Sequence, residues 1–461
     1  MKGLIYYAIR CLTIIAVAAF SSTVNGQDFN GSWNGVLEAP TGSLTIVFNI
    51  HQTGDGVSIT WGVPEQGGFD LPATATISGN ELNVDIPMSG ATYKGTLNGE
   101  TLEGTFSQGG MDFPLNMTQK EDERTLRPQE SAIEADTNKP YHSEEVTFTN
   151  GSITFAATLT VPNAGSRFPA VVLVAGSGVL DRDEENFGHK PFLLLADALS
   201  RNGFAVLRYD ERGGYGTVGG YPYASSEPLA TDAMAALRYL KTRPEVDASR
   251  VGIVGHSEGG LIAVMNAAKH PDEVAFIVSM AGPGVTGYEL GMQQSRLGFK
   301  AHGMEPDPSY LQLCEEKYSI ISAEKDSTNL RGKLMEFAKV HENDPMLQLI
   351  TGGKLEQFLD LETLPMIRGV FQYDPTENLK RVKCPMLAIN GTLDFQVACE
   401  ENLSAIARQV PHATVTSYEG LNHFFQSCDG WENSGNYALI PETMSPVVLK
   451  DIVAWLQETV K

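Results

Sequence analysis

The sequence predicts an all-β N-terminal region, either a small sandwich or a barrel, followed by an α/β domain with a mostly parallel sheet and a helical cap insertion. Three observations predict this class. Residues 27–120 alternate apolar and polar side chains, residues 142–461 place buried strands between amphipathic helices, and a long helical stretch interrupts that second pattern. At 461 residues the chain exceeds one ordinary domain of roughly 100–200 residues, so several folding units are expected.

Composition narrows the classes of function. Hydrophobic residues make up 42% of the chain and charged residues 19%, which provides material for packed cores and argues against disorder. The formal net charge is −23, without a long run of one sign. Because this charge would repel phosphates, nucleic acid is an unfavourable partner. No basic amphipathic face suggests a membrane surface, so we expect neither as a partner.

The N-terminus has the pattern of a signal peptide. Lys2 and Arg10 precede an apolar run over residues 11–20, which is too short to span a bilayer, where about 20 residues are needed. Short side chains before Gln27 suit signal peptidase. We therefore expect residues 1–26 to be removed and the mature protein to be periplasmic or secreted, without insertion in the membrane. An uncleaved N-terminal anchor is the alternative.

The cysteines do not have the spacing of a metal site. Cys11 would leave with the signal peptide, and Cys314, Cys384, Cys399 and Cys428 remain. They contain no CxxC pair and no zinc-like pattern, so we expect no bound metal. An oxidising compartment would permit a disulfide, and Cys399 and Cys428 are the candidate pair because they follow the loops of the predicted acid and base. Four free thiols are the favoured alternative.

Residues 27–120 are predicted to form short antiparallel strands. Apolar and polar residues alternate over residues 44–50, 82–86 and 101–106, and Asn-Gly and Asp-Gly turns separate such runs. No polar cluster in this region has a catalytic pattern. Residues 121–141, which are charged and contain two prolines, are predicted to be a linker.

The region after the linker changes pattern. A predicted hairpin over residues 146–161 is followed by apolar runs without alternation, which amphipathic helices separate. Strands of this kind are buried on both faces and imply a parallel sheet. The predicted buried strands cover residues 170–174, 205–207, 251–254, 274–279, 386–389 and 413–418, and the predicted helices cover residues 191–201, 229–242, 258–269, 397–408 and 445–460.

A helical insertion is predicted between Met280 and the strand at residues 386–389. This stretch is much longer than the crossover of about a dozen residues that two parallel strands require. Asp307-Pro308 has the form of a helix start, and residues 334–340 are amphipathic. Because ligands bind at the carboxyl ends of such strands, we interpret about residues 284–375 as a cap that shapes the acyl or alcohol pocket.

Ser257 is the predicted nucleophile. It is the centre of the pentapeptide Gly255–Gly259 (GHSEG), the one G-x-S-x-G sequence of the chain, and it lies between a buried strand and a helix. A turn of this kind holds the serine in a strained conformation that exposes its hydroxyl at the edge of the sheet. Glycines are required because side chains would collide with the strand and the helix. This context favours a functional motif over a chance match.

Asp394 and His423 are the predicted acid and base. A serine hydroxyl is a weak nucleophile and needs a histidine base, which a carboxylate orients. The two residues follow the last two predicted strands in the order serine, acid, histidine, so their loops open at the same edge as the serine. Glu419 shares the loop of the histidine, and Asp429 comes after it, so both are weaker acids for this role. The other histidines fit this order less well.

The oxyanion of a tetrahedral intermediate needs backbone donors. The N–H of Glu258, directly after the nucleophile, is the first predicted donor. The second is expected from Ala175-Gly176-Ser177-Gly178, whose small residues let the backbone approach a substrate. We prefer Ser177, with Gly178 as the alternative. A role of Ser177 as a second nucleophile has little support, since no G-x-S-x-G turn surrounds it.

Two charged segments are expected at the same edge, namely residues 181–184 (DRDE) and 210–213 (DERG). The simpler interpretation is a network of ion pairs that braces these loops. The alternative is a specific role in binding a carboxylate or phosphate of the substrate.

Residues from about 145 to 461 resemble the α/β-hydrolase superfamily, and specifically the EstD-like bacterial serine carboxylesterases, which are related to dienelactone hydrolases and prolyl-oligopeptidase-type enzymes. The motifs that carry the resemblance are Gly176-Ser177-Gly178, Asp181-Arg182-Asp183-Glu184, Leu207-Arg208-Tyr209-Asp210 with Arg212-Gly213, the GHSEG turn, and Asp394 and His423 in their loops.

This resemblance implies the α/β-hydrolase fold, hydrolysis of short-acyl carboxylic esters, no cofactor, and a triad of Ser257, Asp394 and His423. The chain departs from many relatives at Ala175, where they have histidine, and this difference concerns the oxyanion hole rather than the triad. The N-terminal region resembles accessory domains that are fused to such esterases in exported bacterial proteins.

The sequence thus predicts an exported serine esterase that acts on small-molecule esters without cofactor or metal, and it indicates no particular oligomeric state. One alternative is a serine aminopeptidase of prolyl-oligopeptidase type, although residues 27–120 are too few for the large propeller of such enzymes. The other is a glycan- or cell-wall-binding protein with an inert hydrolase domain. The presence of Ser257, Asp394 and His423 counts against inertness.

Overall fold

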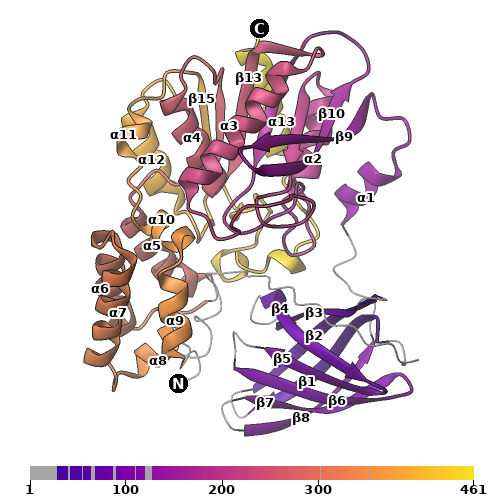
Figure 1. Ribbon diagram of the computed structural model, residues 1–461, viewed down its shortest axis with the longest axis vertical. Coiled ribbons are helices and arrows are strands. Elements are labelled where there is room, and N and C mark those ends of the chain that lie inside the picture. Colours follow the sequence, from indigo (N-terminus) through magenta and orange to yellow (C-terminus); the bar gives the residue numbers. More distant parts are fainter. Residues whose placement is uncertain are drawn as a thin grey trace. The chain divides into compact units, whose positions relative to one another are not determined.

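The computed structural model describes residues 29–39, 42–53, 56–63, 68–86, 90–108, 111–119, 127–301, 303–351 and 354–461. The predicted signal peptide, residues 1–26, lies outside this part of the chain. The chain divides into two compact units (Figure 1). One contains residues 1–126 with 343–358, and the other contains residues 127–342 with 359–461.

The N-terminal unit is a closed antiparallel barrel in which each strand pairs with its neighbour in sequence and the first pairs with the last. Alternation of apolar and polar residues gives each strand one buried face, and the closed sheet leaves no unpaired edge. Of the two predicted architectures, the barrel is therefore the one observed. The strands are β1 (Gly31–Ala39), β2 (Gly42–Thr53), β3 (Gly56–Val63), β4 (Gly68–Ser78), β5 (Glu81–Ile86), β6 (Ala91–Asn98), β7 (Thr101–Gln108) and β8 (Met111–Gln119).

Large side chains fill the interior of the barrel. Trp33, Phe48 and Tyr93 are among its most deeply buried residues. The Tyr93 hydroxyl donates to the carbonyl oxygens of Leu102 and Leu115, both at 3.2 Å, as a buried phenol requires. Burial also raises the pKa of Tyr93 well above its ordinary value. The interior is thus a packed core at these positions.

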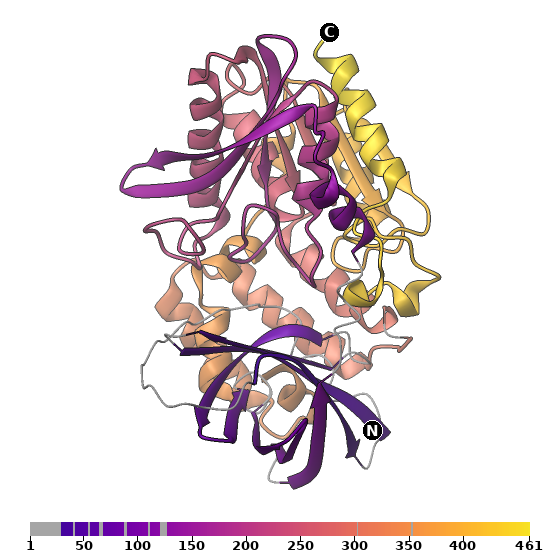
Figure 2. The same cartoon turned by 90° about the vertical axis from the view of Figure 1, so that its right-hand side faces the viewer.

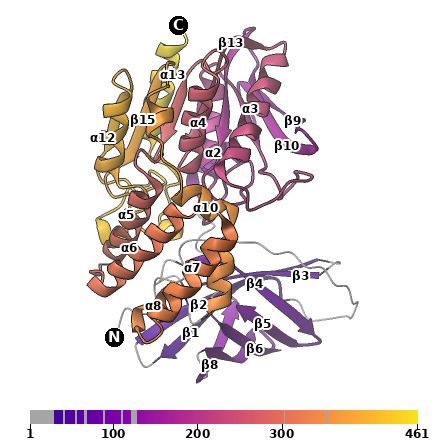
Figure 3. The same cartoon turned by 60° about the vertical axis from the view of Figure 1, so that its left-hand side comes forward.

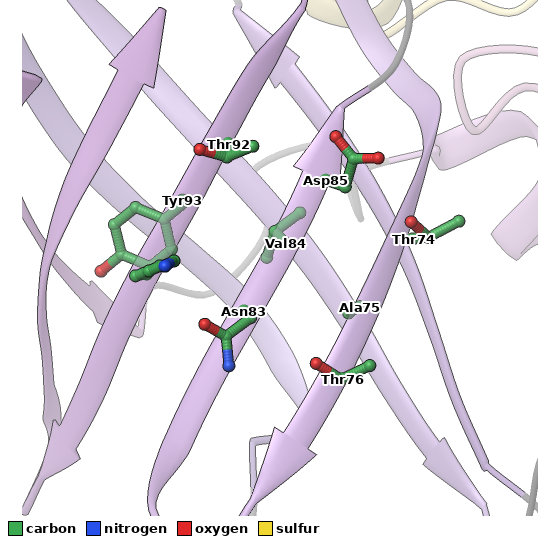
Figure 4. Close-up of a pocket in the computed structure, with 9 residues that line it drawn as sticks. Thr74, Ala75, Thr76, Asn83, Val84, Asp85, Thr92 and Tyr93 are labelled. Carbon is green, nitrogen blue, oxygen red and sulfur yellow. The ribbon is translucent and has the colours of Figure 1, made fainter. Parts of the chain in front are cut away.

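A depression of about 220 Å³ lies on strands β4 to β6 of the barrel, and Figure 4 shows residues that line it. Its middle row consists of the cross-strand neighbours Ala75, Val84 and Tyr93; Val84 and Tyr93 belong to the barrel core, and Ala75 packs against it. Polar residues of the two adjacent rows complete the lining. They are Thr74, Thr76, Asn83, Asp85, Thr92 and Lys94. This lining contains no serine, histidine or cysteine.

The second unit is built on an eight-stranded sheet in the order β16-β15-β14-β13-β11-β12-β10-β9. Strands β11 to β16 pair in parallel, while β9 and β10 form an antiparallel hairpin at one edge (Figure 2). This confirms the predicted mostly parallel sheet. The strands are β9 (Tyr141–Asn150), β10 (Ile153–Pro162), β11 (Phe168–Val174), β12 (Ala205–Tyr209), β13 (Val246–His256), β14 (Ile277–Met280), β15 (Met386–Gly391) and β16 (Thr414–Tyr418).

Helices cover both faces of this sheet, which explains why its strands lack alternation. Ala170 and Val172 of β11 belong to one core with α3, α4 and α12, while Val171 and Leu173 belong to a second core with α2 and α13 (Figure 1). Each strand must therefore be apolar on both sides. The helices are α2 (Pro191–Arg201), α3 (Ser226–Thr242), α4 (Glu258–Lys269), α12 (Cys399–Gln409) and α13 (Pro446–Thr459).

The order of strands reverses at β11, beside the loops that carry the predicted site residues. From β11 the chain passes to β12 on one side, and β13 lies on the other side of β11. At such a reversal the loops after the two neighbouring strands diverge, and ligands bind between them at the carboxyl ends. Val174 at the end of β11 pairs with Gly255 near the end of β13. The loop at residues 175–178 and Ser257 therefore lie side by side.

The predicted helical insertion is confirmed between β14 and β15 (Figure 3). Its helices begin at residues that cap them: Thr286 forms a capping box with Glu289, and Asp307 and Asp326 each accept a backbone N–H of the first turn. The helices are α5 (Gly287–Lys300), α6 (Pro308–Ala323), α7 (Ser327–Val340), α8 (Pro345–Thr351), α9 (Leu355–Glu362), α10 (Pro365–Phe371) and α11 (Thr376–Leu379).

The segment predicted as a linker, residues 121–141, contains a helix, α1 (Pro128–Ala135). The sequence shows no sign of this helix because the segment is short and polar, whereas its polar side chains have partners in the second unit. The buried Arg127 donates to the carbonyl oxygens of Phe187 at 3.0 Å and Gly188 at 3.3 Å. Polar contacts hold this helix in place, so its sequence lacks the apolar periodicity from which a helix is usually predicted.

Gln129 and Glu130 of α1 hold the loop that precedes α13. The Gln129 side chain accepts from the backbone N–H groups of Thr443, at 2.7 Å, and Met444, at 3.2 Å. Its amide also donates to the Met444 carbonyl at 2.8 Å. Glu130 accepts from the Lys190 backbone N–H at 3.1 Å and from the Thr443 hydroxyl. Helix α1 is thus part of the second unit.

We expect Gln129→Ala to lower the melting temperature of a protein of residues 27–461 by several degrees. The substitution leaves backbone groups of the largely buried segment Thr443–Met444 without partners, at a cost of roughly 1–3 kcal/mol for each buried group. Glu134→Ala, at an exposed position of the same helix, is the control and should not change it. Differential scanning calorimetry of both variants checks this, and equal melting temperatures would show that α1 is only a tether.

Candidate active site

Ser257 lies at the junction of β13 and α4 in a left-handed backbone conformation. Its φ is 53° and its ψ is −118°, and its N–H donates to the Met280 carbonyl at 2.8 Å. Non-glycine residues rarely adopt positive φ, and such strain is concentrated at functional sites. The geometry is that expected of a nucleophile held at a sharp strand-to-helix turn.

The two glycines that flank the serine are required by close contacts. A Cβ at Gly255 would lie 2.0 Å from the carbonyl oxygen of Gly259, and a Cβ at Gly259 would lie 2.0 Å from the carbonyl oxygen of Val174. No side chain fits at such distances. A Cβ at Gly176 would lie 3.3 Å from the Ser257 Cβ, so the loop after β11 borders the serine directly.

Asp394 and His423 form a buried hydrogen-bonded pair. His423 Nδ1 lies 2.7 Å from Asp394 Oδ2, and the side chains are 3% and 0% exposed. Asp394 Oδ1 accepts the backbone N–H groups of Gln396 at 2.8 Å and Val397 at 2.9 Å. These bonds fix the carboxylate, which holds the proton of His423 on Nδ1. Nε2 then carries the lone pair that a general base needs.

The loops place these three side chains at one edge of the sheet. Ser257, Asp394 and His423 follow β13, β15 and β16, which are parallel members of the same sheet. The structure therefore joins the predicted acid and base directly. The ring of His423 also packs against that of His256, which is the residue before the serine, with centroids 4.7 Å apart.

The predicted oxyanion donors occupy suitable positions in the backbone. Glu258 is the first residue of α4, so its N–H has no acceptor within the helix. In the loop after β11, the N–H of Gly176 already donates to Glu184 Oε1 at 2.7 Å. This leaves Ser177 and Gly178 as the candidates for the second donor.

The side chain of Glu258 has a role that the sequence did not indicate. Its Oε2 accepts from the Ser177 hydroxyl at 2.7 Å and its Oε1 from the Ser226 hydroxyl at 2.5 Å. Burial raises the pKa of this carboxyl, and the two hydroxyl bonds partly oppose the increase. Glu258 thus ties the loop after β11 to the start of α3. Because Ser177 donates to this carboxyl, its hydroxyl is not arranged as a nucleophile.

The two charged segments form ion pairs within the protein. Arg182 binds both carboxylate oxygens of Asp210 at 2.9 Å. Arg212 binds those of Asp232 at 2.6 and 2.7 Å. The third arginine, Arg208, pairs with Asp183. All three guanidinium groups are thereby engaged, so the structure favours the bracing network over the recognition of a substrate carboxylate.

Glu184 and His256 are further residues of the site, and the sequence interpretation did not predict that they pair. His256 Nδ1 lies 2.9 Å from Glu184 Oε1, and His256 Nε2 lies 3.0 Å from the carbonyl oxygen of His423. The sequence contained one signal for this pair. The acidic segment DRDE follows the strand that became β11, and the histidine of the GHSEG turn ends the strand that became β13. Only the adjacency of β11 and β13 brings the two together.

The described cysteines are free thiols. Cys314, Cys384 and Cys399 are buried, and Cys428 is half-buried. Cys399 and Cys428, the candidate disulfide pair, are therefore unbridged here. Among the described residues, no three histidine, cysteine or acidic side chains gather closely enough to hold a metal ion. Within the same part of the chain, no helix has the length and apolarity to cross a membrane.

The sequence matches one family profile and several curated proteins. The profile of the X-Pro dipeptidyl-peptidase (S15) family matches residues 150–415. Esterase EstD of Thermotoga maritima is 28% identical over 302 residues, which cover 65% of this chain and 64% of that esterase. Human dipeptidyl peptidase 8 is 30% identical over 143 residues, 29% of this chain and 16% of the peptidase. The chain therefore aligns with less than two thirds of either relative.

Solved structures also resemble the chain. An esterase of Pyrococcus furiosus has 16% sequence identity and a TM-score of 0.42, with coverage of 69% of this chain and 91% of its own. The Est1E protein of Butyrivibrio proteoclasticus has 15% identity and a TM-score of 0.41, with coverage of 68% and 98%.

Proposed function

The chain belongs to the X-Pro dipeptidyl-peptidase (S15) family, within the α/β-hydrolases, and from this premise we propose that it is a serine carboxylesterase acting on small-molecule esters with short acyl groups. The observation that carries the proposal is the buried Asp394–His423 pair, with its bond of 2.7 Å, at the same sheet edge as the strained Ser257. This is the arrangement that nucleophilic acyl transfer requires.

In the proposed mechanism Ser257 Oγ attacks the ester carbonyl while His423 Nε2 accepts its proton. Asp394 holds the imidazole in the required tautomer and stabilises the imidazolium that forms. The oxyanion accepts hydrogen bonds from the backbone N–H groups of Glu258 and Ser177. His423 then protonates the leaving alcohol. Water attacks the acyl-enzyme with His423 as base, which releases the acid and restores the serine.

Peptide hydrolysis is the second candidate, because the family profile is that of X-Pro dipeptidyl-peptidases. An aminopeptidase has to bind the ammonium group of its substrate, and carboxylates do so best. Three carboxylates close to the site are buried, and each accepts at least one hydrogen bond within the protein. Glu184 and Glu258 have the partners given above, and Glu211 accepts the Leu180 N–H at 3.0 Å. This favours an ester as the substrate.

The deciding experiment compares p-nitrophenyl esters of increasing acyl length with an Xaa-Pro p-nitroanilide, using mature protein of residues 27–461. We expect the esters to be cleaved, the rate to fall with acyl length, and the anilide to be a poor substrate. The reverse preference would identify a dipeptidyl peptidase. A folded protein that cleaves neither, and whose residues 27–120 bind polysaccharide, would support the binding-protein alternative.

A further inference from the structure

The ring of His256 lies between two hydrogen-bond acceptors. Nδ1 is 2.9 Å from Glu184 Oε1, and Nε2 is 3.0 Å from the carbonyl oxygen of His423. Neither a carboxylate nor a carbonyl can donate a proton, whereas a neutral imidazole has a single N–H. With Glu184 ionised, both bonds can exist together only if both ring nitrogens are protonated. The geometry therefore describes His256 as an imidazolium.

The surroundings of His256 support a positive charge. The residue is 4% exposed, and a buried cation is tolerated only beside a counter-charge. Glu184 supplies that charge, because its side chain is 1% exposed and directly bonded to the ring. Burial by itself lowers the pKa of His256. The attraction and hydrogen bond of Glu184, the His423 carbonyl and the charge of Asp394 outweigh it, so the pKa is raised.

The groups that face the ring come from three loops. Glu184 lies in the loop after β11, Asp394 in the loop after β15, and His423 in the loop after β16. Phe424 and Phe425 cover the ring, with centroids 5.3 and 6.4 Å away. Glu184 and Asp394 are the acidic groups that act on the titration of His256.

We infer that the Glu184–His256 ion pair is a positioning device of the active site, which holds the main chain of His423 and the oxyanion loop in register with Ser257. His256 acts through the carbonyl of His423. Glu184 acts through the N–H of Gly176, which shares its Oε1 at 2.7 Å. His256, which links Glu184 to the carbonyl of His423, directly precedes the nucleophile Ser257 in the sequence. This inference rests on the proposed esterase function.

The pairing also has an electrostatic consequence. His423 becomes positively charged during catalysis. The ring centroid of His256 is only 4.7 Å away, so an uncompensated positive charge on His256 would destabilise the charged form of His423. The Glu184 carboxylate cancels the charge of His256, so the pair positions the base without adding a net charge beside it. Loss of Glu184 has one of two results. Either His256 stays charged without a counter-charge, or it loses a proton and with it one of its two hydrogen bonds.

The test uses His256→Gln and Glu184→Gln in the mature protein, with p-nitrophenyl acetate as substrate. We expect kcat to fall about 10²-fold in each variant, the loss typical of a displacement of about 1 Å in a catalytic group, with KM nearly unchanged. The double variant should be no slower than the slower single variant, because the residues act as one unit. His270→Gln is the control, since His270 faces Glu273 at the far end of α4. It should retain wild-type kcat.

Histidine-selective ¹⁵N NMR of the wild-type protein reads the charge independently of turnover. We expect one histidine, identified by its loss in His256→Gln, to show two protonated ring nitrogens at pH 7. In Glu184→Gln it should titrate at lower pH. An ordinary titration near about 6.5, or wild-type kcat in both variants, would overturn the inference. Wild-type protein that cleaves no ester would instead contradict the proposed function, and the NMR result would still decide the charge of His256.

Discussion

Ser257→Ala is expected to reduce kcat for p-nitrophenyl acetate by about 10⁶-fold, to the level that binding and the oxyanion donors alone provide. The substitution removes the oxygen that forms the acyl-enzyme, and no other group of the turn can replace it. The fold should be unchanged, because the backbone bond from Ser257 N–H to the Met280 carbonyl remains. Burst kinetics and circular dichroism of the purified variant measure both effects.

Ser177→Ala is the matched control for this experiment. Ser177 lies in the neighbouring loop, but its hydroxyl donates to Glu258, and its proposed contribution to catalysis is its backbone N–H, which alanine keeps. We expect a loss of at most about 10²-fold, since one hydrogen bond to a charged group contributes on the order of 1.5–3 kcal/mol. Abolished activity in Ser177→Ala together with an active Ser257→Ala would reverse the assignment of the nucleophile.

Asp394→Asn is expected to lower kcat by about 10⁴-fold without unfolding the protein. Two backbone N–H groups, from Gln396 and Val397, bind Oδ1, so the amide oxygen of asparagine is held at that position. The amide NH₂ must then face His423 Nδ1, which can only accept. The proton moves to Nε2, and this tautomer cannot accept the proton of Ser257.

Asp429→Asn separates this effect from a general loss of negative charge. Asp429 is exposed in the loop after His423 and was the rival acid in the sequence. Its substitution should leave kcat/KM within about twofold of wild type, as is usual for surface changes. If Asp429→Asn lost activity while Asp394→Asn kept it, the buried carboxylate would be structural and the proposed triad would be wrong.

The sequence predicted the parts of the fold that depend on local periodicity. Apolar runs such as residues 170–174 and 251–254 became β11 and β13 because strands covered by helices on both faces must be apolar on both sides. The GHSEG turn was predictable because only glycine fits the contacts of 2.0 Å on either side of the serine. The barrel followed from alternation, although its closure did not, since alternation is the same in a sandwich.

Other features left no local signal. Helix α1 is polar, so its sequence predicts a linker. Only the hydrogen bonds of Gln129 and Glu130 in the folded protein show why it is a helix. The side chain of Glu258 looked like a helix residue of no special role, yet it binds the hydroxyls of Ser177 and Ser226. In each case the interaction joins residues from different elements, and periodicity within one element carries no information about it.

The sequence by itself determined the mostly parallel sheet and the helical insertion, and it predicted Ser257, Asp394 and His423 as the site residues, because hydrophobic patterning and turn chemistry act within a few residues. Only the tertiary structure decided how these residues are supported. Glu184 meets His256 across 72 positions of sequence, and His256 meets the carbonyl of His423 across 167. Such contacts arise from the order of strands in the sheet, which places β11 beside β13, and that order is a property of the whole packed domain.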